Sequence, residues 1–562
     1  MGQVYGGTLV ARTLAASGVK HVFGILGHEL LTTYDACLDY DIEIIGNRHE
    51  SAAIHMADAY ARVTGKPGVC MFTSGPGHAN SVPGATSAHL TDSPLILISA
   101  TSEQTYIDMN ALQEIDQIGM IRPVTKWARK VFEPRRIPEY LGAAFRNALT
   151  GRTGPVHLSL PGDVVGRRFD DPGEPPRLET RRATGRAHPE PAGVERAIEL
   201  LAAAERPVLI VGTSAFWSRA EAELRELVET TQTPAFTLEL ARGLISDEHP
   251  LCYGYADPSL NAPARLFAEA DLVIVAGRRM DWRLGFGQAP FFSADAKLVQ
   301  IDSDENEIGR NRAVDVGMLC DVGAALGDLA KAARGRKWER CGWIGRLDAL
   351  AREQREQRRE VESSDQVPMH PARVAAEIRD FLPADAYLTI DGGDFCHWNR
   401  MTIPARQPAG FMRTFPLGGL GLALPFAIGA KLARPDKPAL CISGDGAFGF
   451  YAFELDTAVR HNAPIVTVVG VDAAWGIEKH AQEGLFGPDR LAGSLLRETR
   501  HDLVAEGLGA YGQHVERPEE LRPALQRAFE SGRPSLIDVR IKGTSSPMTE
   551  RLIRRKREIG AM

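Results

Sequence analysis

Short apolar runs alternate with longer stretches of mixed polarity along most of the chain. Each run ends in small residues and is followed by a helical pattern, as in "KPGVCMFTSGPGHAN", "RPVLIVGTS", "DLVIVAGRR", "AYLTIDGGD" and "PALCISGDG". Apolar strands that alternate with helices predict parallel sheets covered by helices on both faces. Ligands of such sheets bind at the carboxyl ends of the strands, so the residues after each strand are the candidates for chemistry.

Two segments break this pattern and divide the 562 residues into blocks. Residues 166–193 are rich in Pro, Gly and charge, as linkers between domains are, and residues 333–371 are highly charged and partly helical. We therefore predict an α/β fold with three doubly wound parallel-sheet domains. Their expected bounds are 1–165, 190–335 and 366–545, and a basic tail follows over 546–562.

The composition is typical of a globular protein that acts on small molecules. Hydrophobic residues make up 44% of the chain, charged residues make up 24% and the net charge is −7, so we expect no nucleic-acid partner. No stretch approaches about 18 uninterrupted apolar residues, and the N-terminus lacks a leader pattern, so we expect a cytoplasmic protein without a membrane partner. The seven cysteines form no CxxC pair, which favours reduced core residues over a disulfide framework or a zinc site.

An acidic residue follows each of two successive predicted strands. Gly444-Asp445-Gly446 ends the strand "PALCIS", and Asp472 ends the later strand "APIVTVVGV". We expect the two carboxylates side by side, where hard oxygen ligands suit a Mg²⁺ ion that holds phosphates. The flanking glycines would let phosphates approach the backbone. On the triplet alone, a turn whose Asp caps a helix is the alternative.

With the other motifs, this region resembles the thiamine-diphosphate (ThDP) enzymes of the acetolactate synthase, pyruvate decarboxylase, benzaldehyde lyase and oxalyl-CoA decarboxylase superfamily. Their cofactor motif is GDG, then some two dozen residues, then a pair of asparagines, where this chain has Val471-Asp472. The resemblance implies that Asp445, Asp472 and the carbonyl of Ala474 bind Mg²⁺, which holds the diphosphate. It also implies cofactor contacts from Pro76, Asn80, Gly393, Asp394, Gly444, Gly446, Ala447, Trp475 and Gly476.

The same resemblance assigns residues around the reactive end of ThDP. Glu50, in "NRHESAA", matches the family's glutamate, which is shielded from water and shares a proton with the pyrimidine ring; an ordinary first-turn helix carboxylate is the alternative. In "PLGGLGLALPFAIGA", Leu420 aligns with the apolar wedge beneath the cofactor, and Gly418 would offer its carbonyl. Gln113 is placed near the active site. Because the family takes its glutamate and its metal site from different subunits, a homodimer is the minimum active unit and a homotetramer the usual form.

Two features point to a CoA substrate. "VIVAGRRMDWRLGFG" resembles the central domain of oxalyl-CoA decarboxylases and 2-hydroxyacyl-CoA lyases, which contacts CoA or ADP, so Arg278 and Trp282 are candidate contacts; Trp282 as a core residue is the alternative. The tail "SSPMTERLIRRKREIGAM" could fold over the active site and bind CoA phosphates, although solvated termini are often charged. Its candidate contacts are Arg551, Arg554 and Arg555.

The catalytic base is our last assignment. Glu478 occupies the position of a glutamate that faces the thiazolium in pyruvate decarboxylases, and a surface helix glutamate is the alternative. His28 and Glu29 are second candidates, since benzaldehyde lyase has a histidine where this chain has Glu29. We predict a ThDP-dependent lyase that reversibly cleaves a 2-hydroxyacyl-CoA to formyl-CoA and an aldehyde or ketone.

Two rival functions stay open at this stage. An enzyme like acetolactate synthase or benzaldehyde lyase would act on 2-oxoacids or 2-hydroxyketones without CoA. FAD could then occupy the central domain, although ADP is the favoured nucleotide there. A non-catalytic protein that kept the fold is the second rival, and intact Glu50, Asp445 and Leu420 argue against it.

Overall fold

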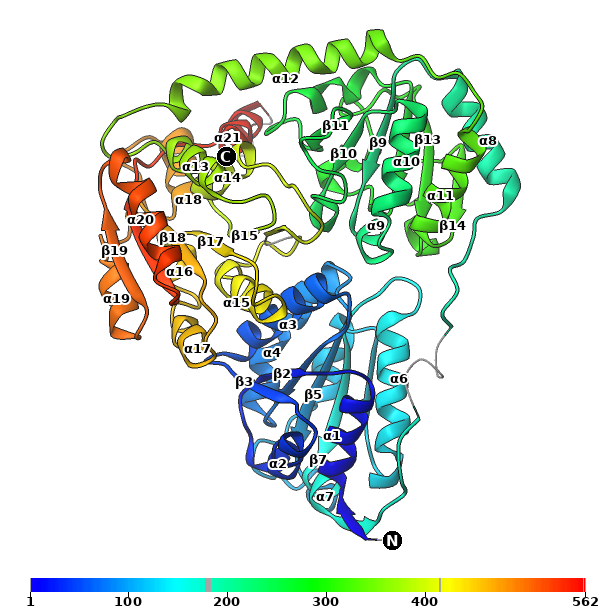
Figure 1. Cartoon of the computed structure of the whole chain (residues 1–562), viewed down its shortest axis with the longest axis vertical. Coiled ribbons are helices and arrows are strands. Elements are labelled where there is room, and N and C mark those ends of the chain that lie inside the picture. The colour runs from blue at the N-terminus through cyan, green and yellow to red at the C-terminus, as the bar shows by residue number, and fades with distance from the viewer. Residues whose placement is uncertain (1, 177–182, 414–415, 559, 561–562) are drawn as a thin grey trace. The chain divides into compact units, whose positions relative to one another are not determined.

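The computed structural model describes residues 2–176, 183–413, 416–558 and 560. It contains three six-stranded parallel sheets, each flanked by helices, which confirms the predicted α/β class (Figure 1). Within those ranges, no helix combines the length and the apolar character needed to cross a membrane. Parts of the predicted linker and tail lie outside the described residues, namely 177–182, 559, 561 and 562.

The first sheet has the strand order β3-β2-β4-β5-β7-β6. Its strands are β2 (His21–Gly24), β3 (Glu43–Gly46), β4 (Gly68–Phe72), β5 (Leu95–Thr101), β6 (Trp127–Lys130) and β7 (Val156–Pro161). Its helices are α1 (Gly6–Ala16), α2 (Leu31–Asp39), α3 (Glu50–Thr64), α4 (Pro76–Leu90), α5 (Gln117–Ile121), α6 (Ile137–Leu149) and α7 (Gly162–Gly166). The predicted linker begins with a short strand, because β8 (Arg168–Asp170) pairs antiparallel with β1 (Gln3–Tyr5).

The second sheet has the order β11-β10-β9-β12-β13-β14. Its strands are β9 (Pro207–Val211), β10 (Ala235–Thr237), β11 (Cys252–Tyr255), β12 (Leu272–Ala276), β13 (Lys297–Asp302) and β14 (Val316–Leu319). The helices are α8 (Pro191–Ala203), α9 (Thr213–Trp217), α10 (Glu221–Thr231), α11 (Val322–Ala333) and the long α12 (Cys341–Glu362). Trp343 and Leu347 of α12 are buried in the core of this sheet, so the charged segment that sequence reasoning found is anchored by its apolar positions.

The third sheet has the order β16-β15-β17-β18-β20-β19. Its strands are β15 (Tyr387–Ile390), β16 (Phe411–Arg413), β17 (Ala439–Gly444), β18 (Val466–Val471), β19 (Tyr511–Val515) and β20 (Ser535–Arg540). The helices are α13 (Pro371–Phe381), α14 (Asp394–Thr402), α16 (Asp445–Phe448), α18 (Gly476–Phe486), α19 (His501–Gly507), α20 (Pro518–Glu530) and α21 (Pro547–Glu558). Its central strands β17 and β18 are buried along almost their whole length, since helices cover both faces of a parallel sheet.

The chain forms two compact units that are not continuous in sequence. The first unit joins residues 1–185 to 414–436 and 451–463, and the second contains the remainder. The first unit therefore includes α15 (Ala423–Ala433) and α17 (Glu454–Arg460), and α15 packs against α3. The three large sheets fall inside the blocks expected from the sequence, whose residue bounds stay predictions.

Six of the seven cysteines are buried, as expected, but Cys341 is exposed at the start of α12. The expectation that every cysteine is a core residue is wrong at this position. The first turn of α12 buries Trp343 rather than the cysteine two positions before it, because only one face of a helix points into the core.

The contact between α3 and α15 leaves no room for a side chain at Gly429. A Cβ atom there would lie 2.2 Å from the carbonyl oxygen of Met56. We expect Gly429→Ala to lower the free energy of unfolding by about 1–3 kcal/mol, because backbone atoms must separate. Thermal unfolding followed by calorimetry would measure the change. Gly345→Ala is the matched control, since this glycine also lies inside a helix but faces open space, and alanine there should stabilise.

Candidate functional site

Two acidic residues follow neighbouring strands of the third sheet, as the sequence predicted. Strands β17 and β18 run parallel, and Gly444 pairs with Gly470 at their carboxyl ends. Asp445 comes directly after the first strand, is 6% exposed, and accepts the backbone N–H of Ala473 at 2.8 Å. The exit from β17 is a short helix, α16, rather than only a turn. Asp472 follows β18 and is half-buried.

The electrostatics of this strand edge favour a bound cation. Burial, and next the charge of Asp472, raises the pKa of Asp445 to about 7. Burial also raises the pKa of Asp472. Two carboxylates that resist ionisation in each other's presence are stabilised when a divalent cation binds between them. The donor set therefore fits Mg²⁺.

The carbonyl oxygen of Ala474 could complete this donor set. Two backbone hydrogen bonds flank it. The carbonyl of Ala473 accepts the N–H of Leu496 at 2.7 Å, and the N–H of Trp475 donates to the carbonyl of Ser494 at 2.8 Å. Neither bond occupies the oxygen of Ala474. Ala473 itself has a φ of 54°, so the chain turns sharply directly after Asp472.

Two glycines at the same sheet edge border open space. Gly393 precedes α14 with a φ of 102°, Gly444 ends β17, and a Cβ atom at either position would have no neighbour within 4 Å. A phosphate can approach backbone at such positions. Gly446 differs, because a Cβ atom there would lie 2.8 Å from the ring of Trp475. Trp475 directly precedes α18, whose first residue is Gly476, and Ala447 is buried in α16.

Asp394 has partners that sequence reasoning did not foresee. One carboxylate oxygen lies 2.7 Å from Nδ1 of His480 on α18, and the other accepts the hydroxyl of Thr549 on α21 at 2.6 Å and the N–H of Ser546 at 3.1 Å. Both oxygens are thus used within the protein. The diphosphate contact expected at this position would then come from backbone rather than from the carboxylate.

Glu50 is a buried carboxylate in the first unit. It is the first residue of α3, is 6% exposed, and accepts the side-chain N–H of Asn80 at 3.1 Å. Asn80 belongs to α4, which begins at the exposed Pro76. A dry carboxylate held by one amide donor can give or receive a proton at its remaining oxygen, which matches the role expected of Glu50.

Glu29 and Gln113 lie together around a residue that sequence reasoning missed. The hydroxyl of Ser74 lies within hydrogen-bond distance of a Glu29 carboxylate oxygen and 2.8 Å from Oε1 of Gln113. Glu29 also accepts the hydroxyl of Thr73 at 3.0 Å. His28 is mostly exposed beside them. The signal for Ser74 was its place directly after the predicted strand in "FTSGPG".

The structure does not test the expected roles of Gly418, Leu420 and Glu478. Leu420 is half-buried in the irregular segment before α15, and Gly418 has a φ of 78° and open space around it. Glu478 is exposed in the first turn of α18, and within the described residues no hydrogen bond joins its side chain to another group. All three assignments stay predictions.

The two candidate CoA contacts in the central domain, Arg278 and Trp282, differ in how far their side chains are buried. Arg278 is buried, and its guanidinium donates to both carboxylate oxygens of Asp281 at 2.7 and 2.8 Å. It therefore already has an internal partner. Trp282 is 50% exposed, so the alternative of a core residue is wrong in this chain.

The basic tail forms helix α21, which packs against α18. Arg551 donates to the hydroxyl of Ser259 at 2.6 Å, and Arg554 and Arg555 are exposed. The helix is anchored at its start by Thr549, which donates to Asp394. The start of the helix is thus held near the sheet edge that carries Asp445 and Asp472, whereas Arg557 contacts the carbonyl of Gly484 near the other end of α18.

Comparison with known proteins gives matches along the whole chain. Sequence models of thiamine pyrophosphate enzymes match the N-terminal TPP binding domain at residues 4–120, the central domain at 194–329 and the C-terminal TPP binding domain at 391–539. A probable acetolactate synthase of Mycobacterium bovis is 36% identical over 95% of both chains. A 2-hydroxyacyl-CoA lyase 2 of Bos taurus is 32% identical over 96% of this chain and 90% of its own length. A sulfoacetaldehyde acetyltransferase of Alcaligenes xylosoxydans is 31% identical over 94% and 91%.

Removing the charge of Asp394 should loosen the tail helix. Asp394→Asn weakens the hydrogen bonds to Thr549 and His480, and losing hydrogen bonds to a charged group costs about 1.5–3 kcal/mol. We expect amide hydrogen exchange in α21 to rise about tenfold or more. Asp365→Asn is the control, because the side chain of Asp365 is exposed and, among the described residues, pairs with Arg373 alone. Equal exchange in the two variants would contradict this role of Asp394.

Asp472 should make ThDP binding depend strongly on Mg²⁺. An aspartate would add a negative charge beside the diphosphate, which a bound cation would compensate. We therefore expect Asp472→Asn to retain more ThDP at low Mg²⁺ than the wild-type protein does, in a calorimetric titration of ThDP at several Mg²⁺ concentrations. The exposed Asp489→Asn controls for net charge. Coinciding curves for wild type and Asp472→Asn would refute the expectation.

Proposed function

The chain belongs to the thiamine pyrophosphate enzyme family, and we propose that it is a carbon–carbon lyase and carboligase that acts on a 2-hydroxyacyl-CoA. The products are formyl-CoA and an aldehyde or ketone, and the reaction is reversible. The observation that carries this proposal is the basic helix α21, whose start is tied to Asp394 beside the candidate metal site. Its exposed arginines suit the phosphates of CoA. The Bos taurus relative, a 2-hydroxyacyl-CoA lyase 2, supports the same branch.

The chain's own groups would bind the cofactor at the third sheet. Asp445, Asp472 and the carbonyl of Ala474 would hold Mg²⁺, and the open backbone at Gly393 and Gly444 would accept the diphosphate. ThDP, when bound, supplies an electron sink for the carbanion that forms as a carbon–carbon bond breaks.

We assign the proton transfers of the proposed reaction to two glutamates. Glu50, which is buried and accepts a hydrogen bond from Asn80, would share a proton with the cofactor's pyrimidine ring. Glu478 would accept the proton of the substrate hydroxyl as the C1–C2 bond breaks. A proton would then be added to the carbon that becomes the formyl group, so the overall reaction neither gains nor loses a proton. Glu29 and Gln113 form a second polar group that could contact the substrate, with His28 beside it.

The assembly is part of the proposal. Glu50 lies in the first compact unit, and Asp445 and Glu478 lie in the second. We propose that a homodimer combines Glu50 of one chain with Asp445 of another, and that two dimers form a tetramer. In the CoA branch, ADP would bind in the central domain.

Acetolactate synthase-like chemistry is the second candidate. It is favoured by the Mycobacterium bovis relative, which is 36% identical and is a probable acetolactate synthase. Such an enzyme would act on 2-oxoacids without CoA, and FAD could occupy the central domain. Benzaldehyde lyase-like cleavage of 2-hydroxyketones belongs to the same class of acyloin chemistry.

The two candidates differ in their products. We expect the protein with ThDP, Mg²⁺ and a panel of 2-hydroxyacyl-CoAs to release formyl-CoA, detected by mass spectrometry together with the carbonyl product. Glu50→Gln should reduce the rate at least a hundredfold, because a positioned general acid–base group contributes about 10²–10⁴-fold.

The control variant is Glu339→Gln, since Glu339 is an exposed residue paired only with Lys337 at the surface. Its rate should equal that of the wild type. Pyruvate is tested in a parallel reaction. Acetolactate from pyruvate, with no formyl-CoA from any thioester, would replace the first candidate with the second.

A further inference from the structure

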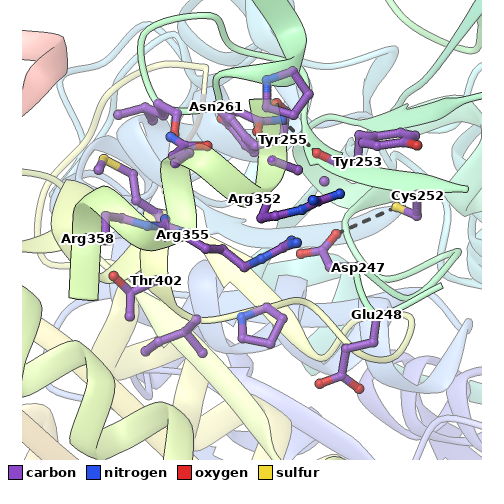
Figure 2. A pocket seen from close by; sticks show the side chains of 18 of the residues that line it. Asp247, Glu248, Cys252, Tyr253, Tyr255, Asn261, Arg352, Arg355, Arg358 and Thr402 are labelled. Carbon is purple, nitrogen blue, oxygen red and sulfur yellow. Dashed lines mark hydrogen bonds between the residues drawn. The ribbon is translucent and has the colours of Figure 1, made fainter. Parts of the chain in front are cut away.

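A cavity of about 870 Å³ lies away from the candidate metal site. It is bounded by α12, by β11 with the loop before it, and by residues 400–404 at the end of α14 (Figure 2). Its volume is within the range of about 300–1,000 Å³ that is usual for ligand sites. Neither Asp445 nor Asp472 lines it.

One face of α12 presents arginines to this cavity. Arg352, Arg355 and Arg359 follow the i, i+3, i+7 spacing of a single helical face, and all three are exposed. Figure 2 shows the side chains of Arg352 and Arg355 reaching into the cavity, toward Asp247 on the opposite wall. Across the part of the chain that the structure describes, none of the three guanidinium groups has a hydrogen-bond or ion-pair partner.

Most of the acidic residues that line the cavity already accept a hydrogen bond or form an ion pair within the protein. Asp247 accepts from Arg242 at 2.9 Å, and Glu248 pairs with Arg406 at 2.8 Å. Glu362 pairs with Arg379 at 2.7 Å, and Asp348 accepts the hydroxyl of Tyr253 at 2.8 Å. Among the described residues, Asp348 and Glu356 have no cationic partner, against four arginines without an anionic partner, namely Arg352, Arg355, Arg359 and Arg400. The cavity therefore has an excess of unpaired positive charge.

The floor of the cavity has a buried arginine with unused donors. Arg400 is 5% exposed, and its Nε and Nη2 atoms have no hydrogen-bond partner within the described residues. Its guanidinium lies over the ring of Tyr255, 4.9 Å from the centroid, which uses the face of the group but not its N–H donors. Burial lowers the pKa of Arg400, and the carboxylates of Asp257 and Glu239 offset this effect only in part. Both atoms are closed off from solvent, so the exposed arginines of α12, rather than these two donors, would meet an anion in the cavity.

We propose that this cavity binds a small-molecule anion with two or more linked phosphate groups. Guanidinium groups bind phosphate through paired N–H donors, and each arginine on α12 can hold one phosphate. The seven-residue span from Arg352 to Arg359 rises about 10 Å along the helix, which suits linked phosphates better than one phosphate. The proposal is independent of the reaction proposed above, because the residues that line this cavity differ from those assigned to ThDP and Mg²⁺.

Calorimetric titration of the full chain with inorganic triphosphate, at about 0.15 M salt, tests the site. We expect the wild-type protein to bind triphosphate, and Arg352→Gln/Arg355→Gln to bind it at least tenfold more weakly. Arg359→Gln alone should weaken binding about threefold. The matched control, Arg225→Gln/Arg336→Gln, removes two exposed arginines outside the cavity and should bind within twofold of wild type. ThDP affinity in the presence of Mg²⁺ should be equal in all variants, which excludes general unfolding.

Parallel titrations with ADP and with CoA distinguish the sources of the phosphates. Tighter binding of either one than of triphosphate, lost in Arg352→Gln/Arg355→Gln, would assign the cavity to a nucleotide. Equal binding of all three would assign it to the phosphate chain alone. Absence of binding by triphosphate, ADP and CoA would overturn the proposal. Affinities equal in the cavity and control double variants would overturn it as well.

Discussion

The mutual repulsion of Asp445 and Asp472 is the constraint on which the candidate site depends. Parallel pairing of β17 with β18 brings both residues to one sheet edge, and burial keeps water from screening their charges. Two backbone N–H groups, from Gly446 and Ala473, stabilise the carboxylate of Asp445 only in part. A divalent cation is the counter-charge that this geometry favours, and the open backbone at Gly393 and Gly444 leaves room for the phosphates that such a cation carries.

The same sheet edge also positions the end of the chain. Asp394 follows β15, the neighbour of β17, and its carboxylate joins α18 to α21 through His480 and Thr549. The helix that begins next to Asp472 and the helix that carries the basic tail are therefore fixed by one buried side chain.

Several arginines of the second unit are buried around the ring of Tyr255. Arg242, Arg400 and Arg413 all lie within about 6 Å of the ring of Tyr255, where the aromatic face stabilises cations. Carboxylates balance some of these cations, as Asp247 does for Arg242. Arg400 has no such partner among the described residues, and it lies at the floor of the arginine-lined cavity. The carboxylates of Glu239 and Asp257 raise the pKa of Arg400 and so offset part of the cost of burying its charge.

Local pattern was enough to predict the strands, the α/β class and the pairing of Asp445 with Asp472, because apolar runs and strand ends follow from short stretches of sequence. The thiamine pyrophosphate family, and with it the expected role of Glu50, was predicted from short sequence motifs. Tertiary structure alone decided the contacts between residues far apart in the chain. Ser74 joins Glu29 to Gln113, and Asp394 meets Thr549, since side-chain directions after folding determine these pairs. Arg352 and Arg355 looked like part of a solvated charged helix, and only the packing of α12 over β11 and residues 400–404 turned them toward one cavity.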